Sequence, residues 1–397
     1  MASVCFYFQV HQPLRLRHYS VFDTDRDYFD DFRNAEICRK VATKCYLPVT
    51  RLLREMIQEH AGRFRVAFSM TGCAIEQFEK YTPDVIDSFR ELAATGCVEF
   101  LSETYYHSLA VLFSPQEFRE QVDIHRAAMK RLFNQEPRVF RNTELVYNND
   151  LAQLTAEMGY DGILAEGADR VLGDRSCNFL YNAPSVKGLT GAKGLKVLLK
   201  NYRLSDDIAF RFSNRQWERW PLTAEKFAAC VNQIHGSGDV CNLFMDLETF
   251  GEHQGAQTGI FDFLRYLPGH VMAGGNNDFL TPSQVIARYP ATGEIDVPQT
   301  TSWADTERDV SAWLGNAMQT NAMHELFKIE TAMKAHGDLD LLADWRMLTC
   351  SDHFYYMCTK YWADGDVHKY FSPYESPYDS YINFMNVLDN IRIRLEQ

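Results

Sequence analysis

The chain has 397 residues, of which 40 are Lys or Arg and 53 are Asp or Glu, so its formal net charge is −13. Hydrophobic residues make up 46% and charged residues 23%, which is ordinary globular usage and excludes a disordered, collagenous or coiled-coil chain. The acid excess argues against a nucleic-acid-binding protein, because neutralising phosphates needs clustered Lys and Arg. Aromatic residues reach 13%, which fits a large core or a cleft lined with rings.

Ten cysteines are scattered along the chain without a C-x-x-C pair, so the sequence predicts neither a metal ribbon nor a redox motif. Several of them, such as Cys5 and Cys241, stand in apolar runs and are expected to be small buried hydrophobes. The first residues do not resemble a signal peptide, and no apolar run approaches the roughly 20 residues of a membrane span. We therefore expect a cytoplasmic protein that contacts no membrane.

Short β-rich runs alternate with helical patterns over about the first 275 residues. A capping box at Ser114-Pro-Gln-Glu117 marks the start of a helix that runs to about Phe133. The alternation predicts a parallel sheet with helices outside, and seven or eight units would close into a barrel. Strands are predicted at 4–10, 65–69, 98–100, 138–141, 162–165, 196–200 and 240–245, with 271–273 as a further candidate. Other helices are predicted at 34–58, between the second strand and residue 95, after Asn149, at 206–212 and at 223–235.

The strand pattern stops after about residue 304. Helical patterns follow at 317–336, 339–361 and 378–397, with Gly337 and the Ser-Pro segment 372–377 as breaks. We expect two parts: a catalytic barrel over residues 1–304, and a helical domain over 305–397 packed on it. The acid-rich stretch at 23–31 is expected to be a solvated loop, with a cation site as the alternative.

Chemically useful side chains stand at the ends of the predicted strands, where a parallel barrel places its working residues. His11 follows the first strand, although a histidine there could equally be a hydrogen-bonded turn residue. Glu99 lies within the third strand and could instead pair with an arginine. Glu144 follows the fourth strand and Asp246 follows the apolar run VCNLFM. Burying such a carboxylate costs several kcal/mol unless it is paired or protonated, which favours a functional use.

Two carboxylates facing each other at a barrel mouth are typical of glycoside cleavage, and their separation decides between retention and inversion. A metal site is the alternative, with His11, His107, Asp246 and His253 as ligands of the kind that deacetylases use. The sequence has no H-E-x-x-H or comparable tight spacing, so we expect no catalytic metal.

Five segments in order resemble the signature regions of glycoside hydrolase family 57. They are FQVHQP at 8–13, GCVEF at 96–100, FRNTELVY at 140–147, FMDLETFGEH at 244–253 and TSWADTERD at 301–309. The resemblance implies a seven-stranded (β/α) barrel followed by a helical region, acting on α-glucans with retention of configuration.

The resemblance also implies roles for individual residues. Glu144 matches the catalytic nucleophile and Asp246 the general acid/base. His11 matches a histidine near the scissile sugar, Glu99 the acid of the second region, and Trp303 an aromatic platform for a sugar ring.

Further residues of these segments are expected to contact substrate. Glu248 and His253 would orient the acid or bind hydroxyl groups, Gln12 lies beside His11, and Tyr147 would stack on a sugar. The sequence departs from the family at Gln9, where many members carry a second histidine, which removes one sugar contact but no catalytic carboxylate.

The local sequence agrees with the two catalytic assignments. The apolar strand before Asp246 is expected to raise the pKa of its carboxyl and so keep a proton available. Arg141, Asn142 and Tyr147 surround Glu144 in the sequence, and their polar groups could keep it ionised.

The sequence therefore predicts an α-amylase-like retaining hydrolase of α-1,4-glucans such as maltodextrin, starch or glycogen, without a cofactor. A 4-α-glucanotransferase or branching enzyme on the same scaffold is the first alternative. A glycan-binding protein without catalysis and a metal-dependent carbohydrate deacetylase are the others. Endo or exo action, α-1,6 specificity and oligomeric state stay open.

Overall fold

The computed structural model describes residues 2–184, 194–273, 277–360 and 367–396. Its strands form two four-stranded sheets, with the orders β3-β2-β1-β8 and β4-β5-β7-β6. Every pairing is parallel except that of β6 with β7. The strands are β1 (Ser3–Val10), β2 (Val66–Met70), β3 (Val98–Phe100), β4 (Val139–Arg141), β5 (Gly162–Glu166), β6 (Leu180–Asn182), β7 (Lys196–Lys200) and β8 (Val240–Asp246).

Backbone hydrogen bonds join the two sheets to each other, both between β3 and β4 and between β7 and β8. Between β3 and β4, the Ser102 N–H donates to the Val139 carbonyl at 3.0 Å, and the Ser102 carbonyl accepts from the Arg141 N–H at 2.8 Å. Between β7 and β8, the Asn201 N–H donates to the Asn242 carbonyl at 2.9 Å. Seven parallel strands thus close into a (β/α)7 barrel, which confirms the predicted fold class, and β6 pairs with β7 outside this set.

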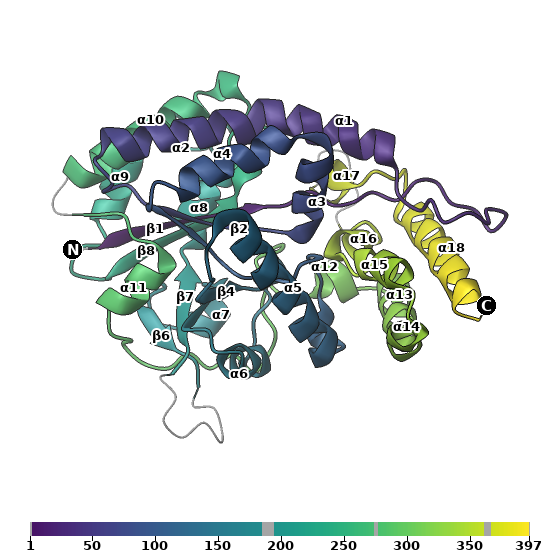
Figure 1. Cartoon of the computed structure of the whole chain (residues 1–397). Coiled ribbons are helices and arrows are strands. Elements are labelled where there is room, and N and C mark those ends of the chain that lie inside the picture. The colour runs from purple at the N-terminus through teal and green to yellow at the C-terminus, as the bar shows by residue number, and fades with distance from the viewer. Residues whose placement is uncertain (1, 185–193, 274–276, 361–366, 397) are drawn as a thin grey trace.

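Apolar side chains fill the inside of the barrel, and helices cover its outside (Figure 1). Strands that are buried on both faces read as continuous apolar runs, which is why β1 and β8 were evident in the sequence. The interior set includes Cys5, Tyr7, Ala67, Leu101, Val139, Leu164, Leu198, Val240 and Phe244.

The α-helices of the barrel part surround the strands. These helices are α1 (Asp31–Val41), α2 (Leu47–Glu59), α3 (Gly72–Tyr81), α4 (Pro83–Ala93), α5 (Pro115–Phe133), α6 (Asn149–Glu157), α7 (Asp169–Leu172), α8 (Tyr202–Ala209), α9 (Ala224–Asn232), α10 (Ile260–Ala273) and α11 (Pro282–Arg288). A π-helical turn, η1 (Ala42–Tyr46), links α1 to α2, and short 3-10 turns are η2 (Ala110–Leu112), η3 (Thr143–Leu145), η4 (Leu247–Thr249) and η5 (Ala256–Thr258).

Three local predictions were wrong. The helix predicted over 339–361 ends at Met347, and a separate helix begins at Ser351. Residues 271–273 end the helix α10 and are not a strand, because Val271 completes its buried face. The strand β6 was missed because it has only three residues. The predicted start at Ser114 is correct, since its side chain accepts from the Glu117 N–H at 3.1 Å. The Glu117 side chain does not complete the capping box but turns toward Arg346 at 2.8 Å.

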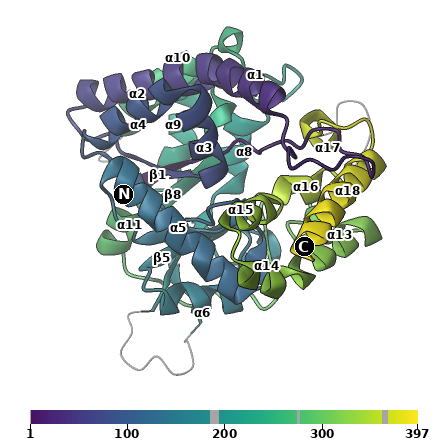
Figure 2. The same ribbon diagram turned by 45° about the vertical axis from the view of Figure 1, so that its right-hand side comes forward.

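The C-terminal helices gather on one side of the barrel, as the turned view shows (Figure 2). Their core includes Trp313 and Trp345, and it also takes in Leu16, Tyr19 and Tyr28 from the segment after β1. The boundary at residue 304 stays a prediction, because the helical part shares its core with that early segment. The helices are α12 (Ser311–Leu314), α13 (Ala317–Lys328), α14 (Glu330–His336), α15 (Leu339–Met347), α16 (Ser351–Tyr355), α17 (Val367–Phe371) and α18 (Pro377–Leu395).

Within the described ranges, none of these helices is both long and apolar enough to cross a lipid bilayer. The acid-rich stretch is partly neutralised by an arginine that precedes it, since Arg17 lies 2.6 Å from Asp25 and 3.8 Å from Asp23.

A buried ion network joins α5 of the barrel to the C-terminal helices. The fully buried Glu117 lies 2.8 Å from Lys334 on α14 and 2.8 Å from Arg346 on α15. Gln121 donates to the same carboxylate at 3.0 Å. A buried carboxylate with three donors is costly to remove, because its partners then lose a charge that offset their own desolvation.

We expect Glu117→Ala to lower the free energy of unfolding by about 3 kcal/mol in urea denaturation, since it removes one member of a buried pair. The matched control is Glu79→Ala, which removes an exposed pair with Arg131 and should cost about 0–1 kcal/mol. Equal losses in the two variants would contradict the assigned role of the network.

Candidate active site

The chemically useful residues meet where the carboxyl ends of the barrel strands face the C-terminal helices. Glu144 stands in η3 directly after β4, and Asp246 ends β8. Ser351 and Asp352 approach from α16. In Figure 1, β1 runs from the N-terminus toward these helices, so both parts of the chain contribute to one site.

The Glu144 carboxylate is held by donors from three segments. His107 Nε2 lies 3.1 Å and Ser351 Oγ 3.3 Å from Oε1, and Trp303 Nε1 donates to Oε2 at 2.7 Å. The backbone of Glu144 is left-handed, with φ of 58°, and that of Leu145 has φ of 50°. Such values are unfavourable for residues other than glycine and are found at functional sites. Local backbone and tertiary contacts together fix the direction of this carboxylate.

Electrostatics keep Glu144 ionised. Burial raises the pKa of Glu144, but the hydrogen bond and charge of His107 and the charge of Arg141 outweigh it, so the pKa lies below its ordinary value. Burial lowers the pKa of His107, but hydrogen bonds to Glu103 and Glu144 raise it to about 9. At neutral pH the pair is therefore a carboxylate and an imidazolium.

Glu103 completes a charged row behind His107, and sequence reasoning did not single it out. Its Oε2 lies 3.5 Å from His107 Nδ1 and 3.9 Å from Arg141 Nη1. Gln9 lies between the same two side chains, 3.3 Å from His107 Nδ1 and bonded to Arg141. The signal for Glu103 was its position four residues after Glu99 and four before His107, just beyond β3.

Asp246 has the opposite tendency to Glu144. Burial raises the pKa of its carboxyl, His253 lowers it and the negative charge of Glu144 raises it, with a net shift upward. The protonated form of Asp246 is thus stabilised relative to that of an exposed aspartic acid. This is the direction expected from the apolar strand β8.

His11 links the barrel to α16. Its Nδ1 lies 2.8 Å from Thr71 Oγ1, its Nε2 lies 2.9 Å from Asp352 Oδ2, and its ring stacks on that of His107 at 3.9 Å. Burial and the charge of His107 lower the pKa of His11, but Asp352 raises it to about 9. Burial raises the pKa of Asp352, and His11 brings it well below its usual range. Asp352 lies beyond the last signature segment, which is why the sequence did not reveal it.

Glu248 and Gln12 form a buried support under His11. Tyr46 donates its hydroxyl hydrogen to Glu248 Oε1, which also accepts from the His11 N–H at 3.3 Å. Gln12 Nε2 donates to the Tyr46 hydroxyl at 3.1 Å. Burial, together with the charge of Asp246, raises the pKa of Glu248 to about 7. Their hydrogen bonds hold Tyr46 and the backbone of His11 in place.

Trp303 and His253 complete the group around the carboxylates. The Trp303 ring is half-buried, with the guanidinium carbon of Arg141 at 4.8 Å and Lys200 Nζ at 5.2 Å from its centre. Its indole N–H binds Glu144, so the ring is oriented by the carboxylate. His253 lies near Asp246, and its ring meets Phe371 edge-on at 5.5 Å.

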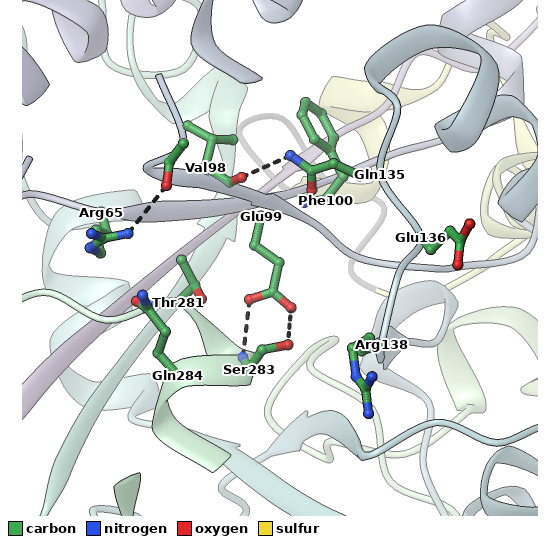
Figure 3. Close-up of a pocket in the computed structure, with 11 residues that line it drawn as sticks. Arg65, Val98, Glu99, Phe100, Gln135, Glu136, Arg138, Thr281, Ser283 and Gln284 are labelled. Carbon is green, nitrogen blue, oxygen red and sulfur yellow. Dashed lines mark hydrogen bonds between the residues drawn. The ribbon is translucent and has the colours of Figure 1, made fainter. Parts of the chain in front are cut away.

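The structure does not bring Glu99 to this site. Glu99 is in register with Ala67, and Ala67 with Tyr7, whereas Asp246 is in register with Gln9, two residues further along β1. The Glu99 carboxylate instead accepts from the N–H and hydroxyl of Ser283 at 3.0 and 2.5 Å (Figure 3). The pocket drawn there is lined by residues such as Arg65, Gln135 and Arg138, and includes none of the residues that hold Glu144.

Tyr147 is likewise not open to a sugar. Its side chain is fully buried and packs in a cluster with Phe140 and Ile163. The backbone of Tyr147 pairs with that of Thr301, which brings the fifth signature segment back to the fourth strand. Its contribution is therefore to the placement of Trp303, two residues further along.

One group within the described ranges has metal-ligand chemistry: His11, Cys350 and Asp352, whose ligand atoms all lie within 4.8 Å of one another. The alternative set of His11, His107, Asp246 and His253 is not such a group in that part of the chain.

The sequence matches the model of glycosyl hydrolase family 57 over residues 5–298. The chain belongs to this family. A Methanocaldococcus jannaschii protein named "Putative alpha-amylase" is 42% identical to it over 399 residues, covering 97% of this chain and 83% of that protein. As a member of family 57 the protein is a glycoside hydrolase.

Solved structures of the family share the fold. The 4-alpha-glucanotransferase of Thermococcus litoralis superposes with a TM-score of 0.68 at 14% identity over 89% of this chain, which spans 56% of that enzyme. The family 57 branching enzyme of Pyrococcus horikoshii gives a TM-score of 0.68 at 15% identity, covering 98% of this chain and 88% of that one. At these identities the likeness concerns the fold alone.

The His107–Glu144 pair predicts a pH effect. In His107→Gln the pKa of Glu144 should rise, because the opposing charge is lost, so the acid limb of kcat/KM should move to higher pH by about 1 unit or more. His125→Gln is the control, since burial lowers the pKa of His125 and keeps it neutral. An acid limb that stays in place in His107→Gln would show that another group keeps Glu144 ionised.

Proposed function

We propose that this family 57 enzyme cleaves α-1,4-glucosidic bonds with retention, using Glu144 as nucleophile and Asp246 as general acid/base. The observation that carries the proposal is the opposite pKa direction of two carboxylates at one barrel mouth. A retaining glycosidase needs one ionised and one protonated carboxyl group on either side of the scissile bond.

In the first step Glu144 attacks the anomeric carbon, and Asp246 gives its proton to the departing glucosyl oxygen. The glycosidic C–O bond breaks as the bond to Glu144 forms, which leaves a covalent glucosyl-enzyme. The three hydrogen-bond donors fix the orientation of the Glu144 carboxylate before the substrate binds. No further reorientation of the nucleophile is then required.

In the second step the ionised Asp246 removes a proton from water, whose oxygen attacks the anomeric carbon and releases Glu144. A sugar hydroxyl in place of water gives transfer to a second glucan. The Glu103 carboxylate, which also lies 3.9 Å from the Arg141 guanidinium, balances the positive charge of His107 throughout. We assign to Glu103 the place of the second-region acid that the resemblance gave to Glu99.

An α-glucan is the proposed substrate, with hydrolysis as the main outcome, because the 42% identical relative is named an alpha-amylase. His11, Trp303 and His253 are the proposed sugar contacts among the predicted residues, and Gln12 and Glu248 support them. A cytoplasmic location belongs to the same proposal, since all ten cysteines are free thiols, as is typical of a reducing compartment.

Transfer to a glucan acceptor is the second candidate, and one observation favours it. Tyr370 and Phe371 are 64% and 43% exposed, and their rings lie next to His253 beside Asp246. Exposed rings suit the flat face of a sugar, and their place is on the side where a leaving or accepting glucan would lie.

Glu144→Gln should lose about 10⁴-fold in kcat on amylose, because the nucleophile is removed while the geometry is kept. Glu99→Gln should retain most of the activity, since Glu99 binds Ser283 away from the site. The measurement is release of reducing sugar by the purified variants. Undiminished turnover in Glu144→Gln would overturn the assignment.

Products of amylose should decide between hydrolysis and transfer. Proton NMR should show the α-anomer first, because two displacements restore the configuration, and reducing ends should accumulate with time. Disproportionated, cyclic or branched glucans with little new reducing sugar would favour the transferase instead. Early β-anomer would exclude the retaining mechanism.

A further inference from the structure

His11, Cys350 and Asp352 bring a nitrogen, a sulfur and an oxygen together beside the nucleophile. His11 Nε2 lies 2.9 Å from Asp352 Oδ2, the Cys350 thiol lies 3.2 Å from the same oxygen, and Cys350 Sγ lies 4.0 Å from His11 Nε2. The glycosidase mechanism uses the imidazole but has no use for the thiol. Nitrogen, thiolate and carboxylate together are the ligand types that zinc prefers.

The spacing of the three atoms suits one tetrahedral ion. Zinc bonds of about 2.0–2.2 Å to nitrogen and oxygen and about 2.3 Å to sulfur place neighbouring ligand atoms roughly 3.3–3.6 Å apart. The observed distances of 2.9, 3.2 and 4.0 Å lie on both sides of this range. Movements of a few tenths of an ångström would therefore close the triangle around a cation.

The backbone holds the two C-terminal ligands in place without an ion. Cys350 forms an antiparallel bridge with Ser108, and the Ser351 N–H donates to the His107 carbonyl at 2.8 Å. The side chains of His11 and Asp352 are 12% and 21% exposed, so they can be reached from the site. Cys350 is buried behind them. A tetrahedral ion with three protein ligands keeps a fourth position for water.

We propose that His11, Cys350 and Asp352 bind a thiophilic divalent cation, with Zn²⁺ as the best-matched ion, and that binding reversibly inhibits the enzyme. The bonds formed are to His11 Nε2, the Cys350 thiolate and an Asp352 oxygen. The thiol proton and the proton between His11 and Asp352 are released to solvent, and no electron is transferred. Ca²⁺ and Mg²⁺ prefer all-oxygen sites and should not compete.

Inhibition follows from what the three ligands touch, and this part rests on the proposed function. His11 stacks on His107, which binds Glu144, and Ser351 between the two other ligands binds the same carboxylate. An ion would occupy the His11 nitrogen that faces the site and would move Ser351. A chelator should then restore activity, whereas it would abolish the activity of a metal-dependent deacetylase.

Binding is tested with Co²⁺ and Zn²⁺ on the full-length protein, independently of turnover. Co²⁺ should give the near-ultraviolet sulfur-to-cobalt charge-transfer band in the wild type and in Cys97→Ser. Cys97 is a suitable control because its buried thiol contacts the Gly62 carbonyl and is not part of the His11–Cys350–Asp352 group. The band should be lost in Cys350→Ser. Zn²⁺ titration should show one site. Its affinity for Zn²⁺ should fall at least ~10–100-fold in Cys350→Ser and in Asp352→Asn, because losing a ligand should cost at least as much affinity as losing a hydrogen bond to a ligand.

The outcomes separate the site from the enzyme's function. No cobalt–sulfur band in the wild type, or a band that persists in Cys350→Ser, would overturn the site even if the protein cleaves amylose. Zn²⁺ binding without loss of amylose hydrolysis would overturn the inhibitory role alone. Inhibition by Zn²⁺ that EDTA reverses, and that Cys350→Ser resists while Cys97→Ser does not, would support both.

Discussion

A histidine held between two carboxylates is the interaction on which this site depends. His107 lies 3.5 Å from Glu103 and 3.1 Å from Glu144, and both raise its pKa to about 9. Its positive charge in turn keeps Glu144 ionised in a buried place where burial alone would favour protonation. For Asp246 the charge of His253 does not outweigh burial, so its pKa is raised. The two carboxylates thus have opposite pKa shifts, as the proposed roles of nucleophile and acid require.

The C-terminal helices belong to this chemistry as much as to the stability of the fold. Ser351 binds Glu144, Asp352 raises the pKa of His11, and Glu117 anchors α14 and α15 to the barrel. A barrel without these helices would expose both imidazoles and leave Glu144 with fewer donors. The same closeness of helix and barrel places the Cys350 thiol beside His11, which links the inferred cation site to the geometry of catalysis.

The fold could be predicted well where burial leaves a pattern in the sequence. Strands buried on both faces are continuous apolar runs, and the start of α5 has a specific cap at Ser114. Prediction failed where the pattern is short or shared: β6 has three residues, and an apolar triplet at 271–273 fits a helix face equally well.

The sequence by itself determined the family, the barrel and the two carboxylates, because these lie in contiguous segments with strong local signals. Only the tertiary structure decided which side chains contact the two carboxylates. Glu99 faces Ser283 rather than the site because strand register places it two residues short, and Glu103 takes its position. Asp352 and Ser351 reach the site from more than 200 residues beyond Glu144. Register and long-range contact are properties of the folded chain, and no local pattern records them.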